Sequence, residues 1–398
     1  MPTDQEMLTL AAIAYRGINL VLPEALKRAH LRRAMDACMA TFTAVKDKWT
    51  IVWGPASFSV VSPGLDDALM YVAQSADLQN LAIAIRGTNP ISLTDWVFGD
   101  LMVTHQVSWA YGDTTDIKDA KISASSALGL GILQRLRWDD AVLRATLSAP
   151  RPASLDGWLH AVQARLQSST AASALQKFAS NLGSAQPENF DPAALLQELP
   201  ASQPASGADL KGFLRGHVEK YPNAEIYVTG HSKGGALSPT LALWLADTRG
   251  PQADRAEEWD PNKKTAVYAY AFAGPTAGNQ EFAKHSDGVL TGCHRIWNKM
   301  DVVPYAFVVD DLQRFKALYN LNPAERAVQD GLINRLIAEV ASLNYTQICG
   351  AGTPFSGALI PNLPFALQLV HQHMDSYLIN FDLINEMNAA SLILAPVL

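Results

Sequence analysis

A strand that runs directly into a glycine-flanked turn and a helix is the feature that most constrains this chain. Residues 225–237 read Glu-Ile-Tyr-Val-Thr-Gly-His-Ser-Lys-Gly-Gly-Ala-Leu. The first half is an apolar, β-rich run, and the apolar residues after the turn recur at helical spacing. In such a G-x-S-x-G turn the small residues let strand and helix pack closely, while the serine is held on a strained elbow above the sheet edge. The sequence therefore predicts Ser232 as a candidate nucleophile.

The composition is that of an ordinary globular protein. The 398 residues are 48% hydrophobic, which suffices for a sizeable core, and we expect one domain over residues 1–398. The formal net charge of −7 offers no electrostatic footprint for nucleic acid. The same sign disfavours electrostatic docking on anionic lipid, so a transient contact with a lipid interface would have to be apolar or local.

The cysteines and the N-terminal sequence limit the cellular compartments that we expect for this protein. Cys38, Cys293 and Cys349 are too few and too scattered for a disulfide framework or a metal site, and we expect buried free thiols. The first twenty residues lack a signal-peptide pattern, and Thr3 with Glu6 predicts a capping box. No apolar run approaches about 18 residues, so no membrane span is indicated. We expect a soluble protein, cytoplasmic or exported by a signal-independent route, unless a signal has already been removed.

Alternating strand and helix patterns predict an α/β fold with a mostly parallel central sheet. Residues 4–47 read as an N-terminal helical layer broken near Pro23, and strand patterns begin at about residue 49. Residues 137–207 are rich in Ala, Ser, Gln and Pro and contain an amphipathic stretch. They predict an inserted helical cap, and the alternative is a helical elaboration of the core.

A serine hydroxyl needs a histidine to take its proton and a carboxylate to orient that histidine. In the α/β-hydrolase order both partners follow the serine, acid first. Four histidines follow Ser232: His285, His294, His371 and His373. His294 begins an apolar strand and is expected to be structural. The late pair, His371 and His373, stands where this order places the base.

The carboxylate is expected just beyond a strand. Asp301 lies in His-Arg-Ile-Trp-Asn-Lys-Met-Asp-Val-Val-Pro, directly after such a run. Asp310 and Asp311 are its rivals, and their position after the next apolar run favours a solvated turn.

The reaction also needs donors aimed at the developing oxyanion. The backbone N–H of Lys233, directly after the nucleophile, is the first candidate. The second is Thr88, where an apolar strand ends in the turn Arg-Gly-Thr, because both its backbone and its hydroxyl can donate.

These segments, in this order, resemble the class 3 lipases, the filamentous-fungal lipase-like group of α/β hydrolases. The strings that carry the resemblance are Ile-Arg-Gly-Thr ending at Thr88, Asp-Trp at 95–96, the turn around Ser232, Phe-Ala-Gly-Pro at 272–275 and Asn-Lys-Met-Asp-Val-Val-Pro at 298–304. They cover about a quarter of the chain. The resemblance implies that Thr88 is an oxyanion donor and that Asp301 is the triad acid.

The resemblance also bears on the base and on a lid. The family places its histidine a few residues before an aromatic residue, and Gln-His-x-x-x-Tyr ending at Tyr377 matches this pattern, which favours His373 over His371. In lipases of this type the segment after the oxyanion turn forms a mobile lid, here residues 89–104; the alternative is that its apolar side chains fill the core. Lys233 departs from the leucine that family members usually carry after the nucleophile.

The hypothesis from the sequence is a serine ester hydrolase of acyl lipids, with Ser232, Asp301 and His373 as its triad and no cofactor or metal. Its substrate would be a lipid or another apolar acyl ester. A phospholipase of the same fold, a secreted lipase effector and a non-catalytic lipase-like interaction protein remain as alternatives.

Overall fold

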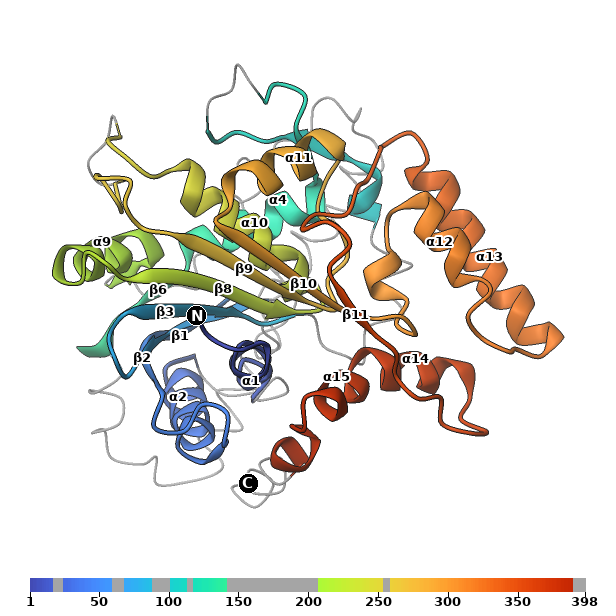
Figure 1. Ribbon diagram of the computed structural model, residues 1–398, viewed down its shortest axis with the longest axis horizontal. Coiled ribbons are helices and arrows are strands. Elements are labelled where there is room, and N and C mark those ends of the chain that lie inside the picture. The colour runs from blue at the N-terminus through green and yellow to red at the C-terminus, as the bar shows by residue number, and fades with distance from the viewer. Residues whose placement is uncertain are drawn as a thin grey trace, which may run out of the picture.

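A seven-stranded sheet forms the centre of the molecule (Figure 1). The computed structural model describes residues 1–16, 24–58, 68–87, 101–112, 117–141, 207–252 and 258–388. In spatial order the strands are β1 (Trp49–Phe58), β2 (Ala68–Ser75), β3 (Asn80–Ile85), β8 (Glu225–His231), β9 (Val267–Phe272), β10 (Gly292–Asn298) and β11 (Thr353–Phe355). The pairs β1–β2 and β2–β3 are antiparallel, and the pairs from β3 to β11 are parallel. The predicted α/β fold with a mostly parallel sheet is therefore confirmed.

Helices cover both faces of this sheet (Figure 1). One face is covered by α1 (Asp4–Ile13) and α2 (Glu24–Thr41), the predicted N-terminal helical layer, together with α15 (Asp375–Asn380). The other face is covered by α4 (Ala124–Arg135), α9 (Leu210–Lys220), α10 (Lys233–Asp247) and α11 (Gln280–Val289). Among the described helices none combines the length and the apolar character needed to cross a membrane.

A third apolar cluster lies beyond the carboxyl ends of the parallel strands. It is built from the short 3-10 helix η5 (Val303–Tyr305), α12 (Val309–Phe315), α13 (Pro323–Val340) and α14 (Phe365–His373). Parallel strands bring their carboxyl ends to one sheet edge, which is the usual place for a site in open α/β sheets. This cluster therefore surrounds the edge at which Ser232 and Asp301 follow their strands.

Two small ribbons frame segments singled out in the sequence. The strands β6 (Arg137–Trp138) and β7 (Ala208–Asp209) pair antiparallel, which brings the two ends of the predicted cap together. The cap's residues 142–206 lie outside the described residues, as do residues 89–100 of the predicted lid. The last lid residues form the 3-10 helix η2 (Leu101–Thr104), and β4 (Gln106–Ser108) pairs with β5 (Lys121–Ser123).

The expectation of three free thiols is wrong. Cys293 and Cys349 form a disulfide, with their Cα atoms 5.1 Å apart, and Cys38 is a buried free thiol. Cys293 lies in β10 and Cys349 lies shortly before β11, the strand that pairs with β10. A separation of 56 residues hides this proximity in the sequence, because the helices α12 and α13 intervene.

Candidate active site

The elbow at Ser232 joins β8 to α10 in the way that the sequence predicts. Ser232 has φ 63° and ψ −127°, a left-handed conformation that is costly for a residue with a Cβ. Close packing imposes this conformation: a Cβ on Gly230 would lie 2.2 Å from the Gly234 carbonyl oxygen, and a Cβ on Gly234 would lie 2.4 Å from the Ile85 oxygen. Glycine is therefore required on both sides of the serine.

The Arg-Gly turn after β3 lies directly against the elbow. Ile85, the last residue of β3, is paired with Gly230 of β8. A Cβ built on Gly87 would come within 2.9 Å of the Ser232 Cβ and 2.4 Å of the His231 oxygen. Thr88, the predicted oxyanion donor, lies outside the described residues. Lys233 is the first residue of α10, where a backbone N–H has no acceptor within the helix.

Asp301 and His373, separated by 72 residues in the chain, meet in the structure. The Nδ1 atom of His373 lies 2.8 Å from Oδ2 of Asp301, and both residues are buried, with exposures of 1% and 0%. Oδ2 also accepts from the Tyr377 hydroxyl at 3.0 Å, and Oδ1 accepts from the Val303 N–H at 3.0 Å. Within the described part of the chain, Nε2 of His373 is buried and makes no hydrogen bond. A histidine with one nitrogen held by a carboxylate can accept a proton on the other nitrogen.

A second layer of polar contacts holds this pair in place. Tyr377 accepts a hydrogen bond from the Asn298 N–H at 2.9 Å, and the Asn298 amide donates to the Gln372 side chain at 2.8 Å. Burial, and then the neighbouring Asp301, raise the pKa of Tyr377 well above its ordinary value, so its hydroxyl stays a donor. Tyr377 belongs to the sequence pattern that favours His373, but the pattern does not reveal that its hydroxyl binds the acid.

His231 connects the elbow to the histidine, and the sequence analysis missed it. Its Nε2 lies 2.8 Å from the His373 carbonyl oxygen, which can only accept, so Nε2 carries the proton. Its Nδ1 lies 3.2 Å from the Tyr15 hydroxyl, which also donates to the His231 carbonyl at 3.1 Å. Burial, and then the nearby His373, lower the pKa of His231 well below its ordinary value, so the ring is neutral. Its position next to Ser232 is the only signal that the sequence offers.

The rival residues lie in other environments. His371 binds the exposed Asp375 at 3.1 Å, four residues further along the chain. Asp310 and Asp311 lie in the first turn of α12, and Asp311 accepts hydrogen bonds from Arg314 and Gln347, both at 3.0 Å.

Two earlier histidines are also engaged elsewhere. His285 lies 2.8 Å from Asp247, and His294 stacks on Tyr270. The structure thus brings together Asp301 and His373. Among the described residues, neither Ser232 nor any rival candidate makes a hydrogen bond with the His373 Nε2 atom.

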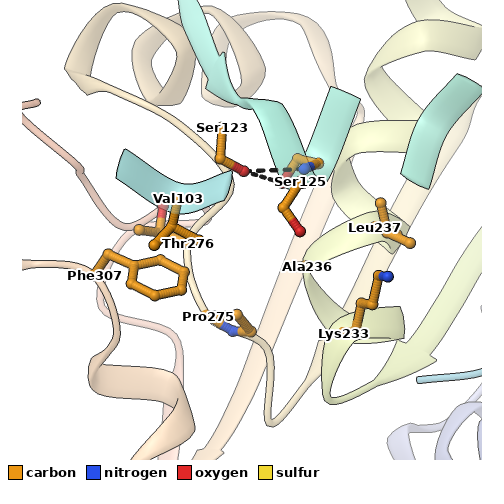
Figure 2. Close-up of a pocket in the computed structure, with 10 residues that line it drawn as sticks. Val103, Ser123, Ser125, Lys233, Ala236, Leu237, Pro275, Thr276 and Phe307 are labelled. Carbon is orange, nitrogen blue, oxygen red and sulfur yellow. Dashed lines mark hydrogen bonds between the residues drawn. The ribbon is translucent and has the colours of Figure 1, made fainter. Parts of the chain in front are cut away.

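A small cavity, partly open to solvent, lies beside the first turn of α10 (Figure 2). It mixes hydroxyl groups at the start of α4 with apolar side chains and the Lys233 stem. Its lining residues are Val103, Ser123, Ser125, Ser126, Lys233, Ala236, Leu237, Pro275, Thr276 and Phe307.

Comparison with known proteins agrees with this geometry. The model of the family described as lipase (class 3) matches residues 196–310, which contain the elbow and Asp301. The described structure resembles the crystal structure of M37 lipase, with a TM-score of 0.69 and 28% identity, over 97% of this chain and 95% of that chain. The expected α/β-hydrolase fold is therefore confirmed, and the chain is a lipase-like hydrolase.

Two further relatives are more distant. A lipase of Caenorhabditis elegans is 30% identical over 88 residues, which span 22% of this chain and 22% of that protein's length. Lipase II from Rhizopus niveus is 16% identical, covers 77% of this chain and 75% of its own, and superposes with a TM-score of 0.37.

Proposed function

We propose that this lipase-like hydrolase is a serine carboxylic ester hydrolase of acyl lipids that acts through Ser232, Asp301 and His373. The observation that carries the proposal is the buried His373, whose Nδ1 lies against Asp301 and whose Nε2 has no hydrogen-bond partner among the described residues. The position of His231 supports this assignment, because it directly precedes Ser232 and its ring centroid lies 4.8 Å from that of His373. An acid, a base and a strained serine in this arrangement are the parts of a catalytic triad.

Each step of the proposed reaction has a residue in this site. His373 takes the Ser232 proton on Nε2 while Asp301 holds the ring and stabilises the imidazolium that forms. Ser232 attacks the ester carbonyl, and the N–H groups of Lys233 and Thr88 stabilise the oxyanion. His373 returns the proton to the leaving alcohol, and an acyl-enzyme remains. Water, activated by the same histidine, then releases the fatty acid.

Replacing the nucleophile tests the proposal directly. Ser232→Ala should lower turnover of p-nitrophenyl esters on the order of 10⁶-fold. Ser238 is a matched control, because it is a buried serine in the same helix and donates to the Gly235 and Tyr270 carbonyl oxygens instead. Ser238→Ala should leave turnover close to wild type. Esterase activity that survives Ser232→Ala would end the proposal.

A series of esters from acetate to palmitate defines the acyl preference. Activity that rises toward palmitate supports a lipase with an apolar acyl site, whereas activity confined to acetate and butyrate would make the protein a small-ester esterase. Complete inactivity on esters and lipids would favour the non-catalytic interaction protein.

A phospholipase activity is the second candidate, because Lys233 lines the cavity together with four hydroxyl-bearing residues. A cation and hydroxyl groups suit a phosphate ester better than they suit a triglyceride. Fatty-acid release from phosphatidylcholine and from triolein should be compared in wild type and Lys233→Leu. A selective loss of phosphatidylcholine hydrolysis would establish the phospholipase, and equal effects on both substrates would reject it. An effector role of such an enzyme is a question for its biological setting.

A further inference from the structure

Residues 340–374 contain no Asp, Glu, Lys or Arg. Charged residues make up 17% of the chain, so a stretch of this length would hold about six at the average frequency. The segment ends in α14, whose last residue is His373. A run without charged residues that leads to His373 is therefore a specific property of this part of the chain.

The same segment exposes apolar side chains and buries polar ones. Leu359, Ile360 and Leu367 are exposed to 46%, 42% and 55%, whereas Gln368 and Gln372 of α14 are buried. Leu369 of α14 is also buried, so this helix buries polar and apolar residues together while it exposes Leu367, which the usual amphipathic helix would bury. We call the surface formed by residues 356–367 the uncharged face. In Figure 1, α14 and the loop before it form an outer corner of the molecule.

Buried glutamines hold the uncharged face in a defined shape. Gln368 accepts a hydrogen bond from the Ile360 N–H at 3.1 Å, and Gln372 donates to the Ala358 carbonyl at 2.7 Å. Asn298, which also contacts Gln372, accepts from the Gly357 N–H at 2.8 Å. The loop is therefore fixed to the elements that hold Asp301 and His373, and its leucines are exposed from a rigid support.

We infer that the uncharged face docks this protein on a neutral lipid surface. The inference rests on the proposed function for the nature of the lipid, and it assigns the docking to residues 356–367 rather than to the predicted lid. Exposed apolar side chains gain free energy when they leave water for lipid, and charged side chains would oppose that transfer. Charged residues lie near this face at both ends. Exposed Asp375 directly follows the charge-free residues 340–374, and exposed Lys299 donates its backbone N–H to the carbonyl of Phe355, which precedes the uncharged face.

The charges of the chain indicate which kind of surface the uncharged face can bind. An anionic membrane is normally recognised by clustered Lys and Arg, and residues 340–374 supply neither. The net charge of −7 also opposes approach to an anionic surface. A triglyceride droplet coated with phosphatidylcholine has no net charge and matches the surface.

Flotation with lipid droplets tests the inference without any turnover. Ser232→Ala protein would be mixed with triolein droplets coated with phosphatidylcholine, and the bound fraction would be measured after centrifugation. Adding Leu359→Glu and Leu367→Glu should weaken binding at least about tenfold, because each leucine then no longer enters lipid. Binding that is unchanged would overturn the inference, as would binding that appears only when phosphatidylglycerol is added.

The helix α13 supplies a matched control. Val328 and Leu332 are exposed to 58% and 37%, but charged residues precede, separate and follow them in α13. Val328→Glu with Leu332→Glu should leave flotation unchanged, and an equal loss in both double variants would overturn the inference. Wild-type protein that forms dimers lost in Leu359→Glu with Leu367→Glu, with flotation retained, would assign the face to a second copy instead.

A soluble ester separates this inference from the proposed function. In protein that keeps Ser232, the double variant Leu359→Glu with Leu367→Glu should retain its turnover of p-nitrophenyl butyrate. Retained turnover also shows that the variant folds. Loss of lipid binding with retained turnover supports the inference. Normal flotation of a protein that hydrolyses no ester would reject the proposed function and leave the docking surface in place.

Discussion

The helices α13 and α14 pack on the same apolar cluster but are stabilised in different ways. α13 begins with an Asn322 capping box, exposes the ion pair Arg335–Glu339 and buries mainly aliphatic residues. α14 begins without a side-chain cap, contains no charged residue and buries two glutamines together with His373. The first helix follows from local sequence rules. The second helix lacks these local signals. Its buried side chains include His373, and its exposed side chains belong to the uncharged face.

The largest expected effect separates two histidines of α14 itself. His373→Ala should reduce ester turnover on the order of 10⁶-fold if it is the base, since triad members act as a unit. His371→Ala removes only a partner of the exposed Asp375 and should leave turnover close to wild type. Steady-state kinetics on p-nitrophenyl butyrate measures both. Similar mild losses would show that neither histidine is the base and that α14 has no special role.

A smaller effect is expected on stability, from one buried glutamine in each helix. Gln372 accepts from Asn298 and Ser376 and donates to Ala358, so Gln372→Leu leaves buried groups unpaired and should cost about 2–4 kcal/mol. Gln329 of α13 accepts only from Arg326 among the described side chains, and its own Nε2 has no partner there. Gln329→Leu should therefore change the free energy of unfolding by less than about 1 kcal/mol. Urea unfolding of both variants compares them, and equal costs would remove the distinction between the helices.

The smallest expected effect is on the pH dependence of the free energy of unfolding, and it arises from His231, which contacts the last residue of α14. His231 donates to the His373 carbonyl, and its depressed pKa means that the folded protein prefers the neutral ring. The unfolded chain takes up a proton below about pH 6.5 and the folded protein does not, so stability is present above this pH and is lost as the pH falls below it. The loss for one histidine is at most about 1.4 kcal/mol per pH unit.

The matched variant for this pH dependence is His231→Gln. It should show a shallower fall of the unfolding free energy between pH 6.5 and pH 5 than wild type, measured by urea unfolding at each pH. A variant that falls as steeply as wild type would show that His231 does not titrate with unfolding.

The parts of the fold and site that could be predicted depend on short continuous strings. The strand, the turn and the helix around Ser232 are contiguous, and Asp301 directly follows β10 with a near neighbour in Pro304. Local spacing is sufficient there, because each residue's position is fixed by the element that precedes it. The choice between His371 and His373 needed the family pattern, since both occupy the last turn of one helix.

Contacts between distant segments could not be predicted in this way. Tyr15 meets His231 across 216 residues, and no periodicity or motif links them. Cys293 and Cys349 looked unrelated because two helices lie between them, and the expectation of free thiols was wrong. The sequence contains a run without charge at residues 340–374, but the exposure of its leucines and the burial of its glutamines are seen only in the structure. Tertiary packing decides these features, and the sequence pattern alone does not.

The left-handed backbone conformation at Ser232 lowers the stability of the fold, whereas the proposed reaction needs the serine hydroxyl at this position. A non-glycine residue at such φ and ψ angles costs on the order of 1–3 kcal/mol, and the tight approach of Gly230 and Gly234 maintains it. Glycine at position 232 would adopt this backbone without the penalty, so the fold alone would favour a residue that has no hydroxyl. A search for thermostable variants that ignored activity would therefore tend to replace the very residue on which the proposed reaction depends.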